Sequence, residues 1–131
     1  MARPFVEIKV RDNGLNAILD TGSWRSYIRE EFAEGFPEAP VQPFEVRLGG
    51  QTSRLSKGIL ISGAVKDTGG KEYLFSGIFF PVKDLGAENG KNIDILVGSL
   101  LLEDWGAVID NSKAPPTVDY RRLREGILVE L

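Results

Sequence analysis

The chain has 131 residues and a formal net charge of −3; 42% of its residues are hydrophobic and 27% are charged. This length and composition predict one globular domain over residues 1–131, without the basic surface that nucleic-acid binding needs. Cysteine and histidine are both absent, which excludes disulfides, thiol nucleophiles, Ser-His-Asp triads and zinc sites with Cys or His ligands. Any enzymatic proton transfer must therefore use carboxylates, Lys, Tyr or water.

The chain shows no targeting or membrane-spanning segment. Its first ten residues alternate in polarity and have no apolar core of the signal-peptide type. The apolar stretch at 99–109 is interrupted by Glu103 and Asp104. We expect a cytoplasmic protein, or a domain excised from a longer chain, with no membrane or nucleic-acid partner. We also expect no cofactor and no metal, although a carboxylate-only site for a hard cation stays open without the EF-hand spacing.

A period of two residues dominates the first third of the chain. It predicts a strand at 5–10, a hairpin turn at 12–14 and a second strand at 15–19 that ends at Asp20. The spacing of Tyr27, Ile28 and Phe32 predicts one short helical turn, which Gly35 and Pro37 stop. Three prolines mark 37–43 as a loop.

The remainder predicts short strands separated by turns. A long hairpin is expected from 44–48 and 51–65 around Gly49-Gly50, followed by a turn at 66–71, a strand at 72–82 and a polar loop at 83–92. A buried strand at 93–98 precedes a short helix at 99–106, with Ser99 as its N-cap and Gly106 just beyond its end. Strands at 107–110 and 127–131 flank a loop at 111–116 and a segment, 117–126, with room for a helical turn. This pattern predicts a mostly β barrel or sandwich.

The tripeptide Asp-Thr-Gly occurs twice, in different surroundings. Asp67 lies between two alternating strands and is followed by Gly69 and Gly70, so an Asx-turn at a hairpin tip explains this copy. Asp20 instead follows the apolar run Ala17-Ile18-Leu19 and precedes an apolar segment. A carboxylate held near the interior needs hydrogen-bond donors or a partner. The Asp20 copy is therefore the candidate for chemistry, and a tight turn between buried strands is its structural alternative.

Three segments in order resemble the retropepsin-like aspartic protease family. They are "AILDTGSWRSYI" around Asp20, the glycine-tipped hairpin "VRLGGQTSRLSKGILISG", and "DILVGSLLLEDWGAVID" near the C-terminus. The first segment is the specific motif, the third supports it, and the resemblance covers most of the chain, from Phe5 to Asp110. It implies a closed β-barrel with a flap hairpin and one short C-terminal helix, active as a symmetric homodimer on peptide or protein substrates.

The resemblance also implies roles for individual residues. Asp20 is the implied catalytic residue, and Thr21, Gly22 and Ser23 support it in the active-site loop. The tip of a mobile flap would be Leu48, Gly49, Gly50 and Gln51, and the floor beneath the active-site loop would be Val97 and Gly98. The implied mechanism activates a water between two Asp20 carboxylates, one from each protomer, that share a proton. The apolar ends 2–6 and 127–131 are candidates for the dimer interface, although each could instead pair within one protomer.

Several positions depart from the family pattern. Trp24 stands where viral members carry an acid, and Ser99 and Leu100 stand where many members carry a polar residue, often Arg or Asp. Both halves of that ion pair are missing together, which argues against a close viral relative. Two other readings stay open: a non-catalytic dimeric module for peptide binding or assembly on the same fold, and an unrelated β-barrel in which the Asp20 motif is an ordinary turn.

Overall fold

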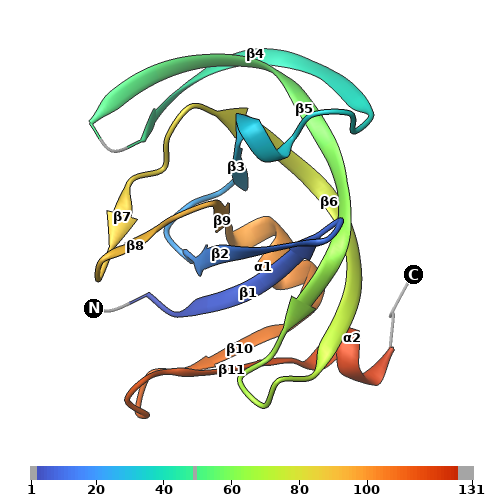
Figure 1. Cartoon of the computed structure of the whole chain (residues 1–131), viewed down its shortest axis with the longest axis vertical. Coiled ribbons are helices and arrows are strands. Elements are labelled where there is room, and N and C mark those ends of the chain that lie inside the picture. The colour runs from blue at the N-terminus through green and yellow to red at the C-terminus, as the bar shows by residue number, and fades with distance from the viewer. Residues whose placement is uncertain (1–2, 49, 127–131) are drawn as a thin grey trace.

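A closed β-barrel forms the body of the molecule in the computed structural model, which describes residues 3–48 and 50–126. Its main sheet has the strand order β1-β2-β9-β3-β6-β5-β4, and a further pairing of β1 with β5 closes six of these strands into the barrel, leaving β4 outside (Figure 1). Of the mostly β barrel or sandwich predicted from the sequence pattern, the structure is the closed barrel that the resemblance implied. The sheet consists of β1 (Phe5–Val10), β2 (Asn13–Leu19), β3 (Tyr27–Arg29), β4 (Glu38–Leu48), β5 (Gln51–Lys66), β6 (Glu72–Val82) and β9 (Ile95–Val97).

The first hairpin is formed as its alternating residues predict. Ile8 and Val10 on β1 and Leu15 on β2 are buried, with polar residues between them facing solvent. The turn lies one residue earlier than predicted, because Val10 pairs directly with Asn13 and Arg11 has a positive φ of 56°. Phe5 and Val6 also pair with β2, so this part of the N-terminal segment is paired within the protomer.

The prediction of a loop at 37–43 is wrong. Most of this segment belongs to β4, which begins at Glu38. The prolines are accommodated because β4 is the edge strand of the sheet and its register shifts between Pro40 and Phe44. The outer half of β5 pairs only with β4, so the hairpin arches over one end of the barrel (Figure 1). Leu48 pairs with Gln51 at its tip, and Gly50 has a φ of 81°. Gly49 lies outside the described residues.

The predicted helical turn at 27–32 is also wrong in its first half. Tyr27 and Ile28 lie in strand β3, buried between β6 and β9, and only Glu30–Phe32 forms a turn of 3-10 helix. Burial on both sides favours the extended form for such apolar residues. The predicted polar loop at 83–92 contains a small hairpin of β7 (Ala87–Glu88) and β8 (Lys91–Asn92).

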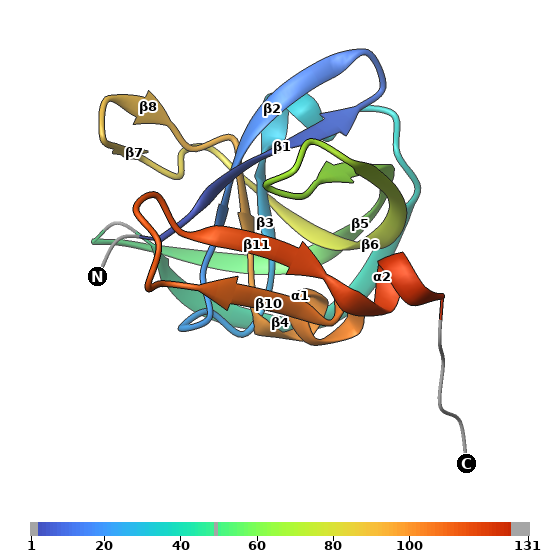
Figure 2. The ribbon, with the colours of Figure 1, turned by 90° about the horizontal axis from the view of Figure 1, so that it is seen from below.

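The predicted helix after β9 is present as α1 (Ser99–Trp105), and Gly106 ends it in the left-handed conformation. Its N-cap is Gly98 and not Ser99, and no side chain caps it. Gly77 of β6 allows α1 to pack closely, because a Cβ there would lie 2.7 Å from Leu101 Cδ2. The chain then forms the pair β10 (Ala107–Asp110) and β11 (Thr117–Tyr120), followed by α2 (Arg121–Glu125), as Figure 2 shows. The predicted strand at 127–131 lies outside the described residues.

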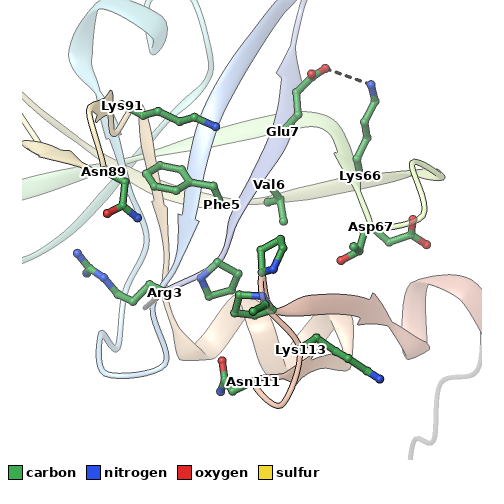
Figure 3. Close-up of a pocket in the computed structure, with 15 residues that line it drawn as sticks. Arg3, Phe5, Val6, Glu7, Lys66, Asp67, Asn89, Lys91, Asn111 and Lys113 are labelled. Atoms are coloured by element: carbon green, nitrogen blue, oxygen red, sulfur yellow. Dashed lines mark ion pairs between the residues drawn. The ribbon is translucent and has the colours of Figure 1, made fainter. Parts of the chain in front are cut away.

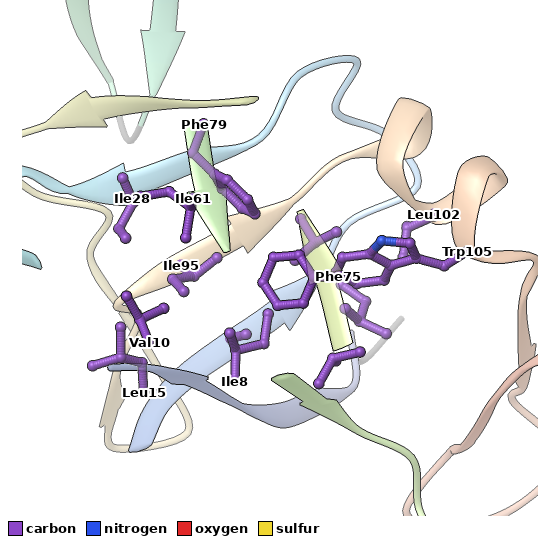
Figure 4. Close-up of a cluster of buried hydrophobic side chains, with 14 of the residues drawn as sticks. Ile8, Val10, Leu15, Ile28, Ile61, Phe75, Phe79, Ile95, Leu102 and Trp105 are labelled. Atoms are coloured by element: carbon purple, nitrogen blue, oxygen red, sulfur yellow. The ribbon is translucent and has the colours of Figure 1, made fainter. Parts of the chain in front are cut away.

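The main core fills the barrel and extends beneath α1 and β11. Isoleucines from the barrel strands meet an aromatic group that includes Phe75 and Trp105 (Figure 4). Between ring centroids, Trp105 lies 5.1 Å from Phe75 and 5.7 Å from Tyr120. A second, smaller core lies under the hairpin, where Phe44 packs edge-on against Phe80 at 5.0 Å. The hairpin is therefore seated on apolar side chains of the barrel and is not free in solvent.

Tyr120 makes the stability of the fold depend on pH in the alkaline range. Its side chain is fully buried, and burial raises the pKa of its hydroxyl far above the ordinary value. A tyrosine in the unfolded chain loses its proton near pH 10. The contribution of Tyr120 to the free energy of unfolding is therefore fully present below about pH 10 and is lost as the pH rises further.

We expect Tyr120→Phe to leave the free energy of unfolding at pH 7 nearly unchanged, because no hydrogen bond to this hydroxyl exists among the described residues. The same substitution should flatten the fall in that free energy between about pH 10 and 12. Urea unfolding at a series of alkaline pH values measures both. An equally steep fall in the variant would contradict the assignment.

Candidate active site

Asp20 lies where two parallel strands end together. Strands β2 and β9 run side by side with Leu19 opposite Val97, and the Asp20 N–H donates to the Val97 carbonyl at 2.9 Å. Leu19 and Val97 are both buried, so Asp20 is the first residue beyond β2 to leave the core. Its side chain keeps 21% of its surface exposed. The strand pair thus holds the carboxylate at the barrel end and leaves it accessible.

The Asp20 carboxylate has a partner for each oxygen. Oδ1 accepts the Gly22 N–H at 2.9 Å, and Oδ2 accepts Arg3 Nη1 at 2.8 Å. The turn is closed by the Ser23 N–H, which donates to the Asp20 carbonyl at 3.2 Å. The expected backbone donor from the Asp-Thr-Gly turn is therefore present, and Thr21 and Gly22 are both exposed beside it.

The junction of β9 and α1 holds the Asp20 loop from beneath. The Gly98 N–H donates to buried Ser26 Oγ at 2.9 Å, and the Ser99 N–H donates to the Ser23 carbonyl at 2.7 Å. A Cβ on Gly98 would lie 2.2 Å from the Arg25 carbonyl oxygen, so only glycine fits between the two segments. The structure thus brings Val97 and Gly98 directly under the loop that carries Asp20 and Ser23.

Arg3 links Asp20 to a distant hairpin. Its Nη2 also contacts Glu88 Oε1 of β7 at 2.7 Å, and this hydrogen bond is the largest cause that raises the pKa of Arg3 above its ordinary value. Arg3 and Glu88 were not among the residues predicted for the site, because they lie 85 positions apart and neither belongs to a motif. No local pattern points to this contact, since Arg3 is only a single cation two residues before the first predicted strand.

Two cavities lie beside Arg3. A cavity of about 290 Å³ is lined by Arg3, Leu19, Asp20, Thr21 and Ile109. A larger one of about 710 Å³ follows the start of β1 and is bounded by the β10–β11 loop (Figure 3). The smaller cavity places open volume against the Asp20 carboxylate.

The described residues at the tip of the β4–β5 hairpin, Leu48, Gly50 and Gln51, do not line that volume. Leu48 and Gln51 instead line a cavity of about 380 Å³ that is shared with Leu55 and Val82 and does not include Asp20. The structure therefore brings together the Asp20 loop and its floor, and it leaves the hairpin tip over a separate cavity.

The second Asp-Thr-Gly is a hairpin tip, as predicted. The Lys71 N–H donates to Asp67 Oδ1 at 2.9 Å, the Asp67 N–H donates to the Lys71 carbonyl at 2.9 Å, and Gly70 has a φ of 87°. Tyr73 donates its hydroxyl to Asp67 Oδ2 at 3.4 Å. Asp67 thus serves its own turn.

No three or more acidic side chains gather in the described ranges into a group that could hold a metal ion. Within residues 3–48 and 50–126, no helix is long and apolar enough to cross a membrane.

Comparison with known proteins gives a structural likeness. No family model and no curated protein matches the sequence. The chain is similar to a solved structure, the retroviral protease-like domain of Ddi1 from Leishmania major, with a TM-score of 0.55 and 18% identity over 91% of this chain and 90% of that chain. At this identity the likeness shows the fold alone. The chain therefore has the mostly β, closed-barrel fold of retropepsin-like domains.

Proposed function

We propose that the protein is an aspartic endopeptidase that hydrolyses peptide bonds of extended polypeptides as a symmetric homodimer. The observation that carries this proposal is the placement of Asp20. Its carboxylate is held at the end of the β2–β9 strand pair, accepts the Gly22 N–H, and keeps part of its surface open to a cavity. Among the residues that the structure describes, a protomer offers one such carboxylate, because Asp67 belongs to a separate turn. The second must then come from another copy across a two-fold axis.

The reaction uses two Asp20 carboxyl groups that share one proton, because like charges so close do not both ionise. The ionised group takes a proton from a bound water as the water oxygen attacks the substrate carbonyl carbon. The protonated group donates its proton to the carbonyl oxygen. The tetrahedral intermediate then collapses and the C–N bond breaks. The leaving amine takes the proton from the carboxyl group that received it from water, and a hydroxyl of the intermediate returns a proton to the other carboxylate, which restores the pair. This chemistry needs neither histidine nor cysteine, both of which the chain lacks.

The neighbouring residues have supporting roles in this proposal. Thr21 braces the two active-site loops across the axis, Gly22 allows the substrate backbone to approach, and Ser23 fixes the loop to its floor at Val97 and Gly98. The hairpin tip, Leu48, Gly49, Gly50 and Gln51, closes over a peptide that lies as an added strand between hairpin and barrel. Because the tip sits over a separate cavity in the described protomer, peptide binding requires the hairpin to shift.

One observation favours the alternative of a non-catalytic dimeric module for peptide binding or assembly. Arg3 Nη1 donates to Asp20 Oδ2 at 2.8 Å, which gives the carboxylate a structural ion pair. A shared-proton pair requires Arg3 to release this oxygen, so that the second carboxyl group can approach it. If Arg3 stays bound in the dimer, Asp20 serves the fold and not hydrolysis.

The test is cleavage of a peptide library by the purified chain from acid to neutral pH, with the oligomeric state measured by analytical ultracentrifugation. We expect a dimer and a bell-shaped dependence of kcat/KM on pH. A folded dimer that cleaves nothing would favour the binding module. A monomer under all conditions would overturn the two-fold arrangement.

A further inference from the structure

Arg25 is a cation held between the Asp20 loop and the hairpin. Its guanidinium carbon lies 4.0 Å from the centre of the Phe44 ring in β4, a cation–π contact. Phe44 in turn packs edge-on against Phe80 of the barrel. Arg25 and Phe44 therefore connect the loop that carries Asp20 to the inner face of the hairpin.

The backbone at Arg25 is rigid, which fixes where the side chain begins. Ser23 Oγ donates to the Arg25 carbonyl at 2.9 Å, and that same carbonyl packs against Gly98. The next residue, Ser26, is buried and accepts the Gly98 N–H. A group on such an anchored backbone can select a ligand, since little further ordering is needed when the ligand binds.

The charge of Arg25 has no anionic partner in the part of the chain that the structure describes. Its guanidinium makes no ion pair or hydrogen bond there, whereas Arg3, Arg29 and Arg124 each pair with a carboxylate at 3.0 Å or less. Arg25 is nevertheless partly buried, unlike the exposed Arg47 and Arg122. Its charge also acts on buried Tyr27, whose pKa is raised by burial and lowered by Arg25. An unpaired guanidinium on a partly buried residue leaves donors that a carboxylate could satisfy.

We propose that Arg25 selects an acidic side chain of the bound peptide, close to the bond that is cleaved. This inference rests on the proposed function, because it places the peptide between the hairpin and the Asp20 loop. One face of the guanidinium lies on Phe44, and its edge is left for a bidentate contact with Glu or Asp. Side chains of an extended peptide alternate in direction, so we expect the preference at one position and not at its immediate neighbours.

The experiment compares peptides that differ only by Glu, Gln or Lys at one position, scanned along a sequence that the wild type cleaves. The readout is the ratio of kcat/KM for each Glu and Gln pair. We expect a ratio of about ten at one position, the size of one charge-assisted pair. Arg25→Met should reduce the ratio to near one, Arg25→Glu should reverse it in favour of Lys, and Arg25→Lys should retain part of it.

Matched variants distinguish selection of an acidic side chain by Arg25 from a purely structural role in which Arg25 ties the hairpin to the loop. Arg47→Glu changes the charge by the same amount on the exposed side of β4, and it should keep the wild-type preference. If Arg25 only ties the hairpin to the loop, Arg25→Met and Arg25→Lys would lower the melting temperature while the Glu to Gln ratio stays unchanged. That result would overturn the inference.

Binding of the same peptides, carrying a fluorescent label and measured by fluorescence anisotropy, tests the role of Arg25 independently of hydrolysis. Cleavage without any preference for acid would overturn the role of Arg25 and leave the peptidase proposal standing. Absence of cleavage, with binding that favours Glu and depends on Arg25, would overturn the peptidase proposal and support the selection. Absence of both cleavage and binding would overturn both.

Discussion

Asp20→Asn is expected to reduce peptide hydrolysis by at least about a thousandfold, because it removes both the acid and the base of the proposed reaction. The amide oxygen can still accept the Gly22 N–H that Asp20 Oδ1 accepts now. The loop should therefore persist, and circular dichroism and thermal unfolding check this. The loss of charge opposite Arg3 should cost little, since that ion pair is partly exposed.

The second Asp-Thr-Gly supplies the control for this substitution. Asp67→Asn makes the same chemical change in a turn where Asp67 Oδ1 also accepts a backbone N–H. It should leave kcat/KM unchanged. Equal activity of wild type and Asp20→Asn would show that the cleavage comes from a contaminant or that Asp20 is not the catalytic group.

Gly98→Ala is expected to destabilise the fold by at least about 3 kcal/mol, which is more than overpacking in a yielding core costs. The added Cβ would lie 2.2 Å from the Arg25 carbonyl oxygen and 2.9 Å from the Ser23 carbonyl oxygen. Both atoms belong to backbone fixed by hydrogen bonds and cannot rotate away. Because the displaced backbone is the Asp20 loop, any folded fraction should also lose activity.

Urea or thermal unfolding measures this effect, with an expected fall in the melting temperature of about 10 °C. Gly69→Ala is the matched control, because its Cβ would lie 3.4 Å from Asp67 Oδ1 and meet nothing closer. It should change stability by less than about 1 kcal/mol. A Gly98→Ala variant as stable as Gly69→Ala would show that the loop and its floor are not packed as described.

Local patterns in the sequence predicted the parts of this site that depend on local geometry. Alternation predicted the strand that ends at Asp20, and the paired glycines distinguished the turn at Asp67 from the motif at Asp20. The apolar run before Gly98 predicted a buried strand, which β9 supplies. Each of these features is decided by neighbours in the chain, so a single sequence contains it.

Features that depend on distant partners were missed or predicted wrongly. The contact of Arg3 with Asp20 and Glu88 joins three separate segments, and nothing near any of them indicates it. The prolines at 37–43 favoured a loop, yet edge pairing with β5 makes most of this segment strand. Tyr27 and Ile28 have helical spacing with Phe32, but they are extended because β6 and β9 enclose them. In each case tertiary packing outweighed the local pattern.

The measurement that tests the proposed two-fold site most directly is hydrolysis by mixtures of wild type and Asp20→Asn, after protomers have been allowed to exchange at constant total concentration. If each active site needs one Asp20 from each protomer, activity follows the square of the wild-type fraction, and an equal mixture retains about a quarter of it. Activity that falls in proportion to the wild-type fraction, with exchange confirmed by mass spectrometry of the dimers, would show that one Asp20 suffices and would contradict the shared pair.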